Sequence, residues 1–167
     1  ALLPQVVDAV DIPVIAAGGF GDGRSLAAGF MLGAEGIQVG TRFVVAKESN
    51  AHDNFKQSIL KSDDLSTVVT GEITGHPVRV LRNQLTKEYL SVQKSITSDE
   101  KPDFTVLEDL GSGALYRAVV QGDTKSGSMM AGQIAGLIDK EQTVEEIILD
   151  YITEAKEVFK NSKPYFE

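Results

Sequence analysis

Apolar residues in the first forty positions alternate between two spacings. Residues 2–10 place apolar side chains three to four positions apart, which predicts a helix. Residues 11–19 and 35–41 each contain a short apolar run between turn residues, the pattern of a strand buried on both faces. Residues 22–34 between them again have helical spacing. The order helix, strand, helix, strand indicates consecutive βα units and a parallel sheet.

The middle of the chain has a different pattern. Residues 48–61 predict a polar amphipathic helix, and residues 83–94 a second one. Between them, residues 65–83 hold β-type runs interrupted by glycine and proline, so we expect a loop or a short hairpin. Residues 95–104 are polar and contain proline, which makes them the best linker candidate.

Small residues dominate the segment that follows. Residues 105–123 predict short helices interrupted at Gly111 and Gly113. Residues 126–138 predict a helix whose faces carry mostly glycine, alanine and serine. We interpret the small faces as close packing on a neighbouring element.

The last helix has the clearest sequence signal. Thr143 and Glu146 have the spacing of a capping box, which predicts the helix start at residue 143. An apolar stripe at helical spacing follows. It consists of Val144, Ile147, Ile148, Tyr151, Ile152, Ala155 and Phe159.

Composition is typical of a soluble globular protein, with 167 residues, 42% of them apolar and 24% charged. The absence of cysteine excludes disulfides, thiolate metal sites and a cysteine nucleophile. A net charge of −8 argues against general nucleic-acid binding, which needs basic residues against phosphates. A cytoplasmic location fits the absence of cysteine. No apolar run approaches the roughly 20 residues of a membrane span, so we expect no membrane contact.

Glycine follows both predicted strands. Gly18 and Gly19 end the first, and Gly40 and Thr41 end the second. In a parallel sheet these ends lie on the same side, and exposed N–H groups there, including those where the next helix begins, can bind an anion such as phosphate. Alternatively, the glycines only permit tight turns.

These residues carry a family resemblance. The segment "IPVIAAGGFGDGRSLAAGFMLGAEGIQVGTRF" resembles the FMN phosphate-binding segment of the superfamily that contains nitronate monooxygenases and flavin-dependent enoyl-acyl carrier protein reductases II. Downstream, "GHPVR" and "AGQIAGL" extend the resemblance to about Phe159, and their order is most similar to the FabK-type reductases.

The resemblance implies a cofactor and a reaction. FMN would be reduced by NADH or NADPH and would reduce a trans-2-enoyl thioester on acyl carrier protein in fatty acid synthesis. Nitronate monooxygenase is the alternative enzyme, and a non-catalytic segment that binds phosphate and partner chains is another alternative. The residues implied at the FMN phosphate, chiefly through backbone N–H groups, are Gly18, Gly19, Gln38, Val39, Gly40 and Thr41. The resemblance also suggests that residues 128–133 approach the flavin, where the Gln133 amide could hydrogen-bond a ring edge.

The resemblance also implies a fold, the C-terminal portion of a (β/α)8 barrel. Such barrels take about 250 residues, so we expect an N-terminal barrel half in the same parent chain or in another chain. We also expect a homo-oligomer. The catalytic residues would lie in that half, and this chain alone would be inactive. We expect residues 1–50 to be the last βα units, 51–110 a helical insertion or lid, and 111–167 C-terminal helices that pack back on the barrel.

The two histidines and their neighbours allow further hypotheses. His52 lies in a polar stretch and is expected to be solvated. His76 precedes Arg79, which could meet an anionic group on a cofactor or carrier. The alternative is a loop that Arg79 and Asn83 anchor. No spacing of histidines or carboxylates predicts a metal site.

Overall fold

The computed structural model describes residues 2–96 and 104–163, which divide into two compact units. The first unit combines Ala1–Glu48 with Glu141–Glu167, and the second is Ser49–Lys140. The helices and strands follow the sequence prediction closely in the first unit and with one clear exception in the second. In the part of the chain that is described, no helix is both long and apolar enough to cross a membrane.

The first unit contains the two expected strands in a parallel pair. Strand β1 aligns with β2 over three residues, Ile15 with Gly36 through Ala17 with Gln38. The alternation of helix and strand is therefore confirmed. The elements of this unit are α1 (Leu2–Ala9), β1 (Ile15–Ala17), α2 (Gly23–Met31), β2 (Gly36–Gln38), α3 (Thr41–Val44) and α8 (Val144–Ser162).

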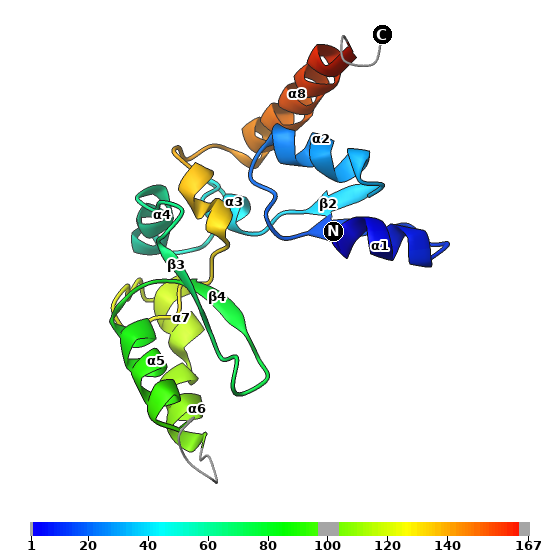
Figure 1. Cartoon of the computed structure of the whole chain (residues 1–167). Helices are drawn as coiled ribbons and strands as arrows, with labels where there is room; N and C mark the ends of the chain where they lie inside the picture. Colours follow the sequence, from blue (N-terminus) through cyan, green and yellow to red (C-terminus); the bar gives the residue numbers. More distant parts are fainter. Residues whose placement is uncertain (1, 97–103, 164–167) are drawn as a thin grey trace. The chain divides into compact units, whose positions relative to one another are not determined.

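Helix α8 begins with the predicted capping box. The Glu146 N–H donates to Thr143 Oγ1 at 3.1 Å, and the Thr143 N–H donates to Glu146 Oε2 at 2.7 Å. Of the predicted stripe, Ile147, Tyr151 and Ala155 are buried. This face packs along α2, and Figure 1 shows the two helices side by side.

The expectation that both strands are buried on both faces is wrong. Ile15 of β1 is 57% exposed, and Ala17 is exposed as well, whereas Ala16 between them is buried. The reason is the size of the sheet, because within residues 2–96 and 104–163 the parallel sheet has two strands. A two-stranded sheet with one covered face leaves every second side chain in solvent.

The second unit is built around an antiparallel hairpin, which the sequence predicted as one of two options. Strand β3 pairs with β4 from Thr67 opposite Leu81 to Thr70 opposite Val78. The proposed linker at 95–104 lies mostly outside the described residues, since 97–103 are not described and 95–96 end a helix. The elements are α4 (Asp53–Leu60), β3 (Thr67–Thr70), β4 (Val78–Leu81), α5 (Gln84–Ile96), α6 (Thr105–Gly111), α7 (Ala114–Val119) and a 3-10 turn (Gln133–Leu137).

The predicted helix over 126–138 is wrong except for that 3-10 turn. The Leu81 N–H donates to the Met129 carbonyl at 2.9 Å, and the Ala131 N–H donates to the Arg79 carbonyl at 3.2 Å. Residues 129–131 therefore run beside β4 as an extended segment. Glycine-rich sequence has a low intrinsic helix preference, so these hydrogen bonds to a strand determine its conformation.

The boundary expected near residue 110 is not one of the boundaries between the units. The Asn83 side-chain amide donates to the carbonyls of Thr124 at 3.0 Å and Gly127 at 2.7 Å. These bonds join residues 111–140 to the hairpin and α5. Within residues 141–163, α8 packs on α2 in the first unit.

Gly23→Ala tests how tightly α2 packs on α8. An added Cβ at Gly23 would lie 2.5 Å from the Tyr151 carbonyl oxygen and 2.7 Å from the Ala155 nitrogen, closer than real Cβ atoms come to backbone. We expect the free energy of unfolding to fall by about 1–3 kcal/mol in urea titrations. Gly40→Ala is the control, because its Cβ would meet no atom within 4 Å. Equal stabilities of the two variants would contradict the packing argument.

Candidate functional site

The structure brings the two glycine turns to the same end of the sheet, as the sequence predicted. Because Ala17 pairs with Gln38, the next residues of each strand, Gly18 and Val39, leave the sheet at the same level. We call Gly18–Gly19 and Gly40–Thr41 together the glycine cradle. Gly18, Gly19 and Gly40 are exposed in the first unit.

The cradle glycines face open space. A Cβ added at Gly18, Gly19 or Gly40 would meet no atom within 4 Å. Every other glycine of the first unit for which contacts are known adjoins protein atoms, at 3.0 Å or less from the added Cβ. These packing glycines are Gly23, Gly29, Gly33 and Gly36.

Gly40 is the most informative cradle residue. Gly18 and Gly19 have φ angles of +89° and +84°, which by themselves favour glycine. Gly40 has a φ of −104°, a value that other residues also adopt. Neither backbone geometry nor packing in the described chain therefore requires glycine at position 40. The open side of Gly40 leaves room for a group outside the chain to approach the backbone, and this fits a phosphate.

The first turn of α2 is less available for a phosphate than the sequence suggested. The Gly23 N–H donates to Glu154 Oε2 at 2.8 Å, and the Ser25 N–H donates to Asp22 Oδ1 at 3.0 Å. The N–H groups of Gly21 and Asp22 donate to Ser25 Oγ. A phosphate site at this end of the sheet therefore rests on the glycine cradle, and the expectation of free N–H groups at the helix start is wrong for these residues.

Asp22 remains ionised at the start of α2. Burial acts to raise its pKa, but the hydrogen bonds from the Arg24 side chain and the Ser25 N–H outweigh burial and lower it. The Arg24 Nε donates to Asp22 Oδ2 at 2.6 Å. The negative charge stabilises the helix start, because it lies at the positive end of the helix dipole.

The other proposed phosphate residues have different environments. Gln38 ends β2 and is exposed, and Thr41 begins α3 and is half-buried. Val39 packs its side chain against a buried cluster that includes Ile147 and Tyr151 of α8. Val39 can therefore offer only its backbone to a ligand, which agrees with the implied role of N–H groups.

Two residues near the cradle were not predicted from the sequence. Tyr151 Oη donates to the carbonyl of Phe20, directly after Gly19, at 3.1 Å. Arg42, one residue after the cradle, is only 6% exposed and donates a hydrogen bond to Gln142 Oε1. An arginine within the apolar run "VGTRFVVA" was the available signal, because a buried guanidinium needs partners.

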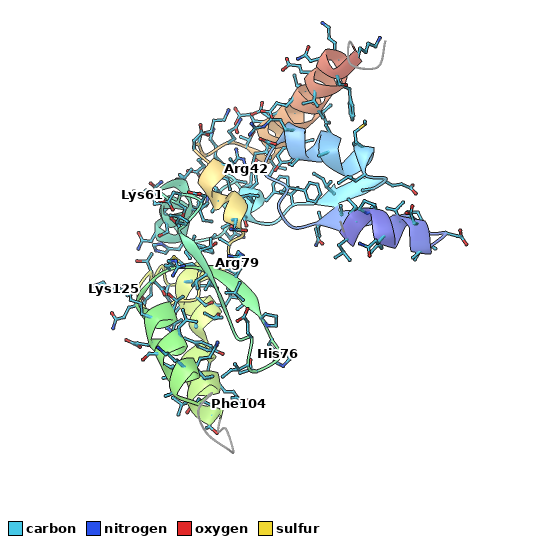
Figure 2. All side chains as sticks on the ribbon, viewed as in Figure 1. Arg42, Lys61, His76, Arg79, Phe104 and Lys125 are labelled. Atoms are coloured by element: carbon cyan, nitrogen blue, oxygen red, sulfur yellow. The ribbon has the colours of Figure 1, made fainter. Side chains whose placement is uncertain are left out.

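The two histidines of the second unit have different environments. His52 is not simply solvated, since its Nδ1 accepts from the Asn54 N–H at 3.1 Å and caps α4. His76 is exposed at the tip of the β3–β4 hairpin (Figure 2). The Arg79 guanidinium donates to Thr67 Oγ1 at 3.1 Å across the hairpin. Together with the Asn83 bonds, this supports the anchored-loop alternative.

Two further features complete the second unit. A cavity of about 350 Å³ lies between the hairpin and helices α5 and α6, with Val80, Leu85 and Leu107 among the residues that line it. Gln133, considered for a ligand ring, is exposed at the start of the 3-10 turn. The described residues contain no group of three or more histidine, aspartate and glutamate side chains able to hold a metal ion.

The chain has a mixed α/β fold of the TIM-barrel type. Its first unit contains consecutive βα units of such a fold. The family then follows from the sequence. The chain belongs to the nitronate monooxygenase family, whose model matches residues 1–154. Members of this family are FMN-dependent oxidoreductases.

Two solved structures are similar to this chain. FabK from Thermotoga maritima has 45% sequence identity and a TM-score of 0.89, and the match covers 99% of this chain and 51% of that one. A nitroalkane oxidase from Streptomyces ansochromogenes has 29% identity and a TM-score of 0.76, with 96% of this chain and 44% of that one covered.

The curated relatives are named differently. A probable nitronate monooxygenase of Staphylococcus saprophyticus is 35% identical over 158 residues, 95% of this chain and 43% of its own length. A probable nitronate monooxygenase of Staphylococcus aureus is 38% identical over 133 residues, 80% of this chain and 36% of its own length. The chain therefore spans about half the length, or less, of the relatives it matches.

The Tyr151 hydroxyl, which bonds to the carbonyl of Phe20 beside the cradle, should lose its proton at a higher pH than an exposed tyrosine. Its titration therefore tests its burial. Burial raises its pKa from the ordinary 10.0 to about 12, although the positive charge of Arg42 acts in the opposite direction. The folded protein therefore favours the protonated hydroxyl. This contribution to stability is complete below pH 10 and is lost as the pH rises towards about 12.

The measurement is a titration of tyrosinate absorbance in the folded chain. The chain has four tyrosines, and the ionisation step at the highest pH should disappear in Tyr151→Phe. The same step should remain in the control Tyr116→Phe, because Tyr116 is 58% exposed. An unchanged late step in Tyr151→Phe would show that Tyr151 is not buried as described.

Proposed function

We propose that the complete protein that contains this chain is an FMN-dependent enoyl-acyl carrier protein reductase, and that this chain holds the FMN phosphate. The observation that carries the proposal is the open side of Gly40, where neither backbone angle nor packing explains glycine. The two cradle turns lie at the carboxyl end of the sheet, where β/α barrels often bind phosphate.

The residues at the cradle have distinct proposed roles. Gly18, Gly19 and Gly40 allow the phosphate to approach the backbone, whose N–H groups donate to its oxygens. Val39 holds its strand end in place through its packed side chain, and Thr41 adds a hydroxyl donor. When bound, the flavin supplies hydride chemistry, and the protein supplies orientation and exclusion of water.

The reductase is preferred over its main alternative on similarity. The identity to FabK from Thermotoga maritima is 45% over almost the whole chain, against 29% to the nitroalkane oxidase. Nitronate monooxygenase remains the second candidate, supported by the family match and by the names of the curated relatives.

The proposed reductase also implies partners for this chain. The exposed side chains of Ile15, Phe30 and Met31 leave apolar surface uncovered on the first unit, which supports an N-terminal barrel half that packs there. Reduction would use NADH or NADPH, the substrate would be a thioester of acyl carrier protein, and the enzyme would form a homo-oligomer.

Gly40 substitutions test the phosphate role. Asparagine and aspartate have nearly the same shape, and either fits the open space at position 40. In the complete protein we expect FMN affinity to fall about tenfold for Gly40→Asn and on the order of a hundredfold for Gly40→Asp, since a carboxylate also repels the phosphate. Isothermal titration with FMN measures both, and circular dichroism checks the fold. Unchanged FMN affinity in both variants would remove Gly40 from the site.

An anaerobic assay separates the two enzymes. With NADH and crotonyl thioester, we expect the complete protein to oxidise NADH in proportion to the thioester that is reduced. Nitronate with oxygen is the parallel assay, and faster turnover there would favour nitronate monooxygenase. Activity in neither assay, with FMN bound, would favour the non-catalytic alternative.

A further inference from the structure

The spacing between the two cradle turns is not determined by the sheet alone. Strands β1 and β2 align over three residues each, and both cradle turns lie beyond the last aligned pair. A phosphate that contacts both turns needs them at a fixed separation. The contacts that fix each turn must therefore come from another element of the first unit, and α8 supplies them.

The first turn is held by Tyr151 and Glu154. Tyr151 Oη donates to the Phe20 carbonyl at 3.1 Å, one residue after Gly19. One helical turn further along α8, Glu154 accepts from the Gly23 N–H at 2.8 Å. The chain between the cradle and α2 is thus hydrogen-bonded to the same helix at both ends.

The second turn is held by Gln142, which lies two residues before α8 begins and bonds to Asp150 of α8. Arg42 follows the cradle directly and donates to Gln142 Oε1, and the Gln142 amide donates to Asp150 Oδ2 at 2.8 Å. The backbone of Gln142 is fixed as well, because its carbonyl accepts from the Lys47 N–H at 2.9 Å. Figure 2 labels Arg42 within this unit.

Apolar contacts connect the same elements. Val39 and Phe43 flank Gly40–Thr41, and both pack against the buried cluster that contains Ile147 and Tyr151. The cluster that contains Tyr151 therefore packs on the neighbours of the second turn, and the Tyr151 hydroxyl bonds to Phe20 beside the first turn.

We propose that α8 sets the separation of the two cradle turns, with Tyr151 and Gln142 as positioning residues for the phosphate of the flavin. This inference rests on the proposed FMN phosphate site. Neither residue contacts the phosphate: Tyr151 fixes the carbonyl that follows Gly19, and Gln142 fixes Arg42 after Thr41. Loss of either hydrogen bond lets one turn move relative to the other while the apolar contacts keep the helix in place.

Comparison of FMN with riboflavin tests the positioning role, because riboflavin lacks the phosphate. In the complete protein we expect Tyr151→Phe to weaken FMN binding about tenfold, the effect of one lost hydrogen bond near a charged group, and to leave riboflavin binding unchanged. Gln142→Leu should have the same effect, since it removes the bond to Arg42 and keeps the backbone bond to Lys47. Tyr116→Phe, in the second unit, is the matched control and should leave both affinities unchanged.

Each outcome bears on one proposal. A lower ratio of FMN to riboflavin affinity in Tyr151→Phe and Gln142→Leu supports the inference. If the unsubstituted protein prefers FMN and neither variant changes the ratio, the inference is wrong and the phosphate site stands. Equal weakening of FMN and riboflavin indicates a merely structural role and also overturns it. If the unsubstituted protein binds riboflavin as tightly as FMN, the proposed phosphate site itself is wrong.

Discussion

The close packing of α8 on the start of α2 is the contact on which the first unit depends. Gly23 lacks a side chain, so the backbones of the two helices approach closely, and Glu154 then accepts from the Gly23 N–H. A parallel pair of three residues per strand buries little surface by itself. The apolar face of α8, centred on Ile147 and Tyr151, supplies the buried contacts that the short sheet lacks. The fold of the βα units and the position of the cradle therefore depend on a helix about one hundred residues later in the chain.

The same dependence separates two kinds of glycine that look alike in the sequence. At Gly23, Gly29 and Gly36, protein atoms occupy the space that a larger side chain would need. The cradle glycines have empty space instead, and at Gly40 the backbone angle gives no reason for glycine either. At Gly40, in the second glycine turn at the strand ends, the open space is compatible with close approach by a group outside the chain. The sequence pattern could not make this distinction, since it depends on which atoms surround each position.

Features that depend on neighbouring residues were predictable, and those that depend on distant partners were not. The capping box at Thr143 and the helical spacing of α2 are local, and both were confirmed. Residues 126–138 were predicted as a helix because small residues at that spacing are compatible with one, but Met129 instead pairs with Leu81, almost fifty residues away. Strand burial was overestimated for a similar reason, because it depends on how many strands cover the sheet. Tyr151 and Gln142 were missed because only the folded chain brings them beside the cradle.

A phosphate site of this kind constrains the cofactor more than the reaction. In the proposed site, backbone N–H groups at the cradle would bind the phosphate monoester of FMN, which is at the opposite end of the cofactor from the ring that exchanges hydride. An enoyl reductase and a nitronate monooxygenase can therefore use the same phosphate site, and they differ in the groups around the ring and the acceptor. A shared phosphate site would be consistent with a chain that is 45% identical to FabK and also matches relatives named for another reaction. If the cradle holds the phosphate as proposed, the choice between the two reactions lies in residues near the acceptor, and α8 would serve both equally by keeping the phosphate end in place.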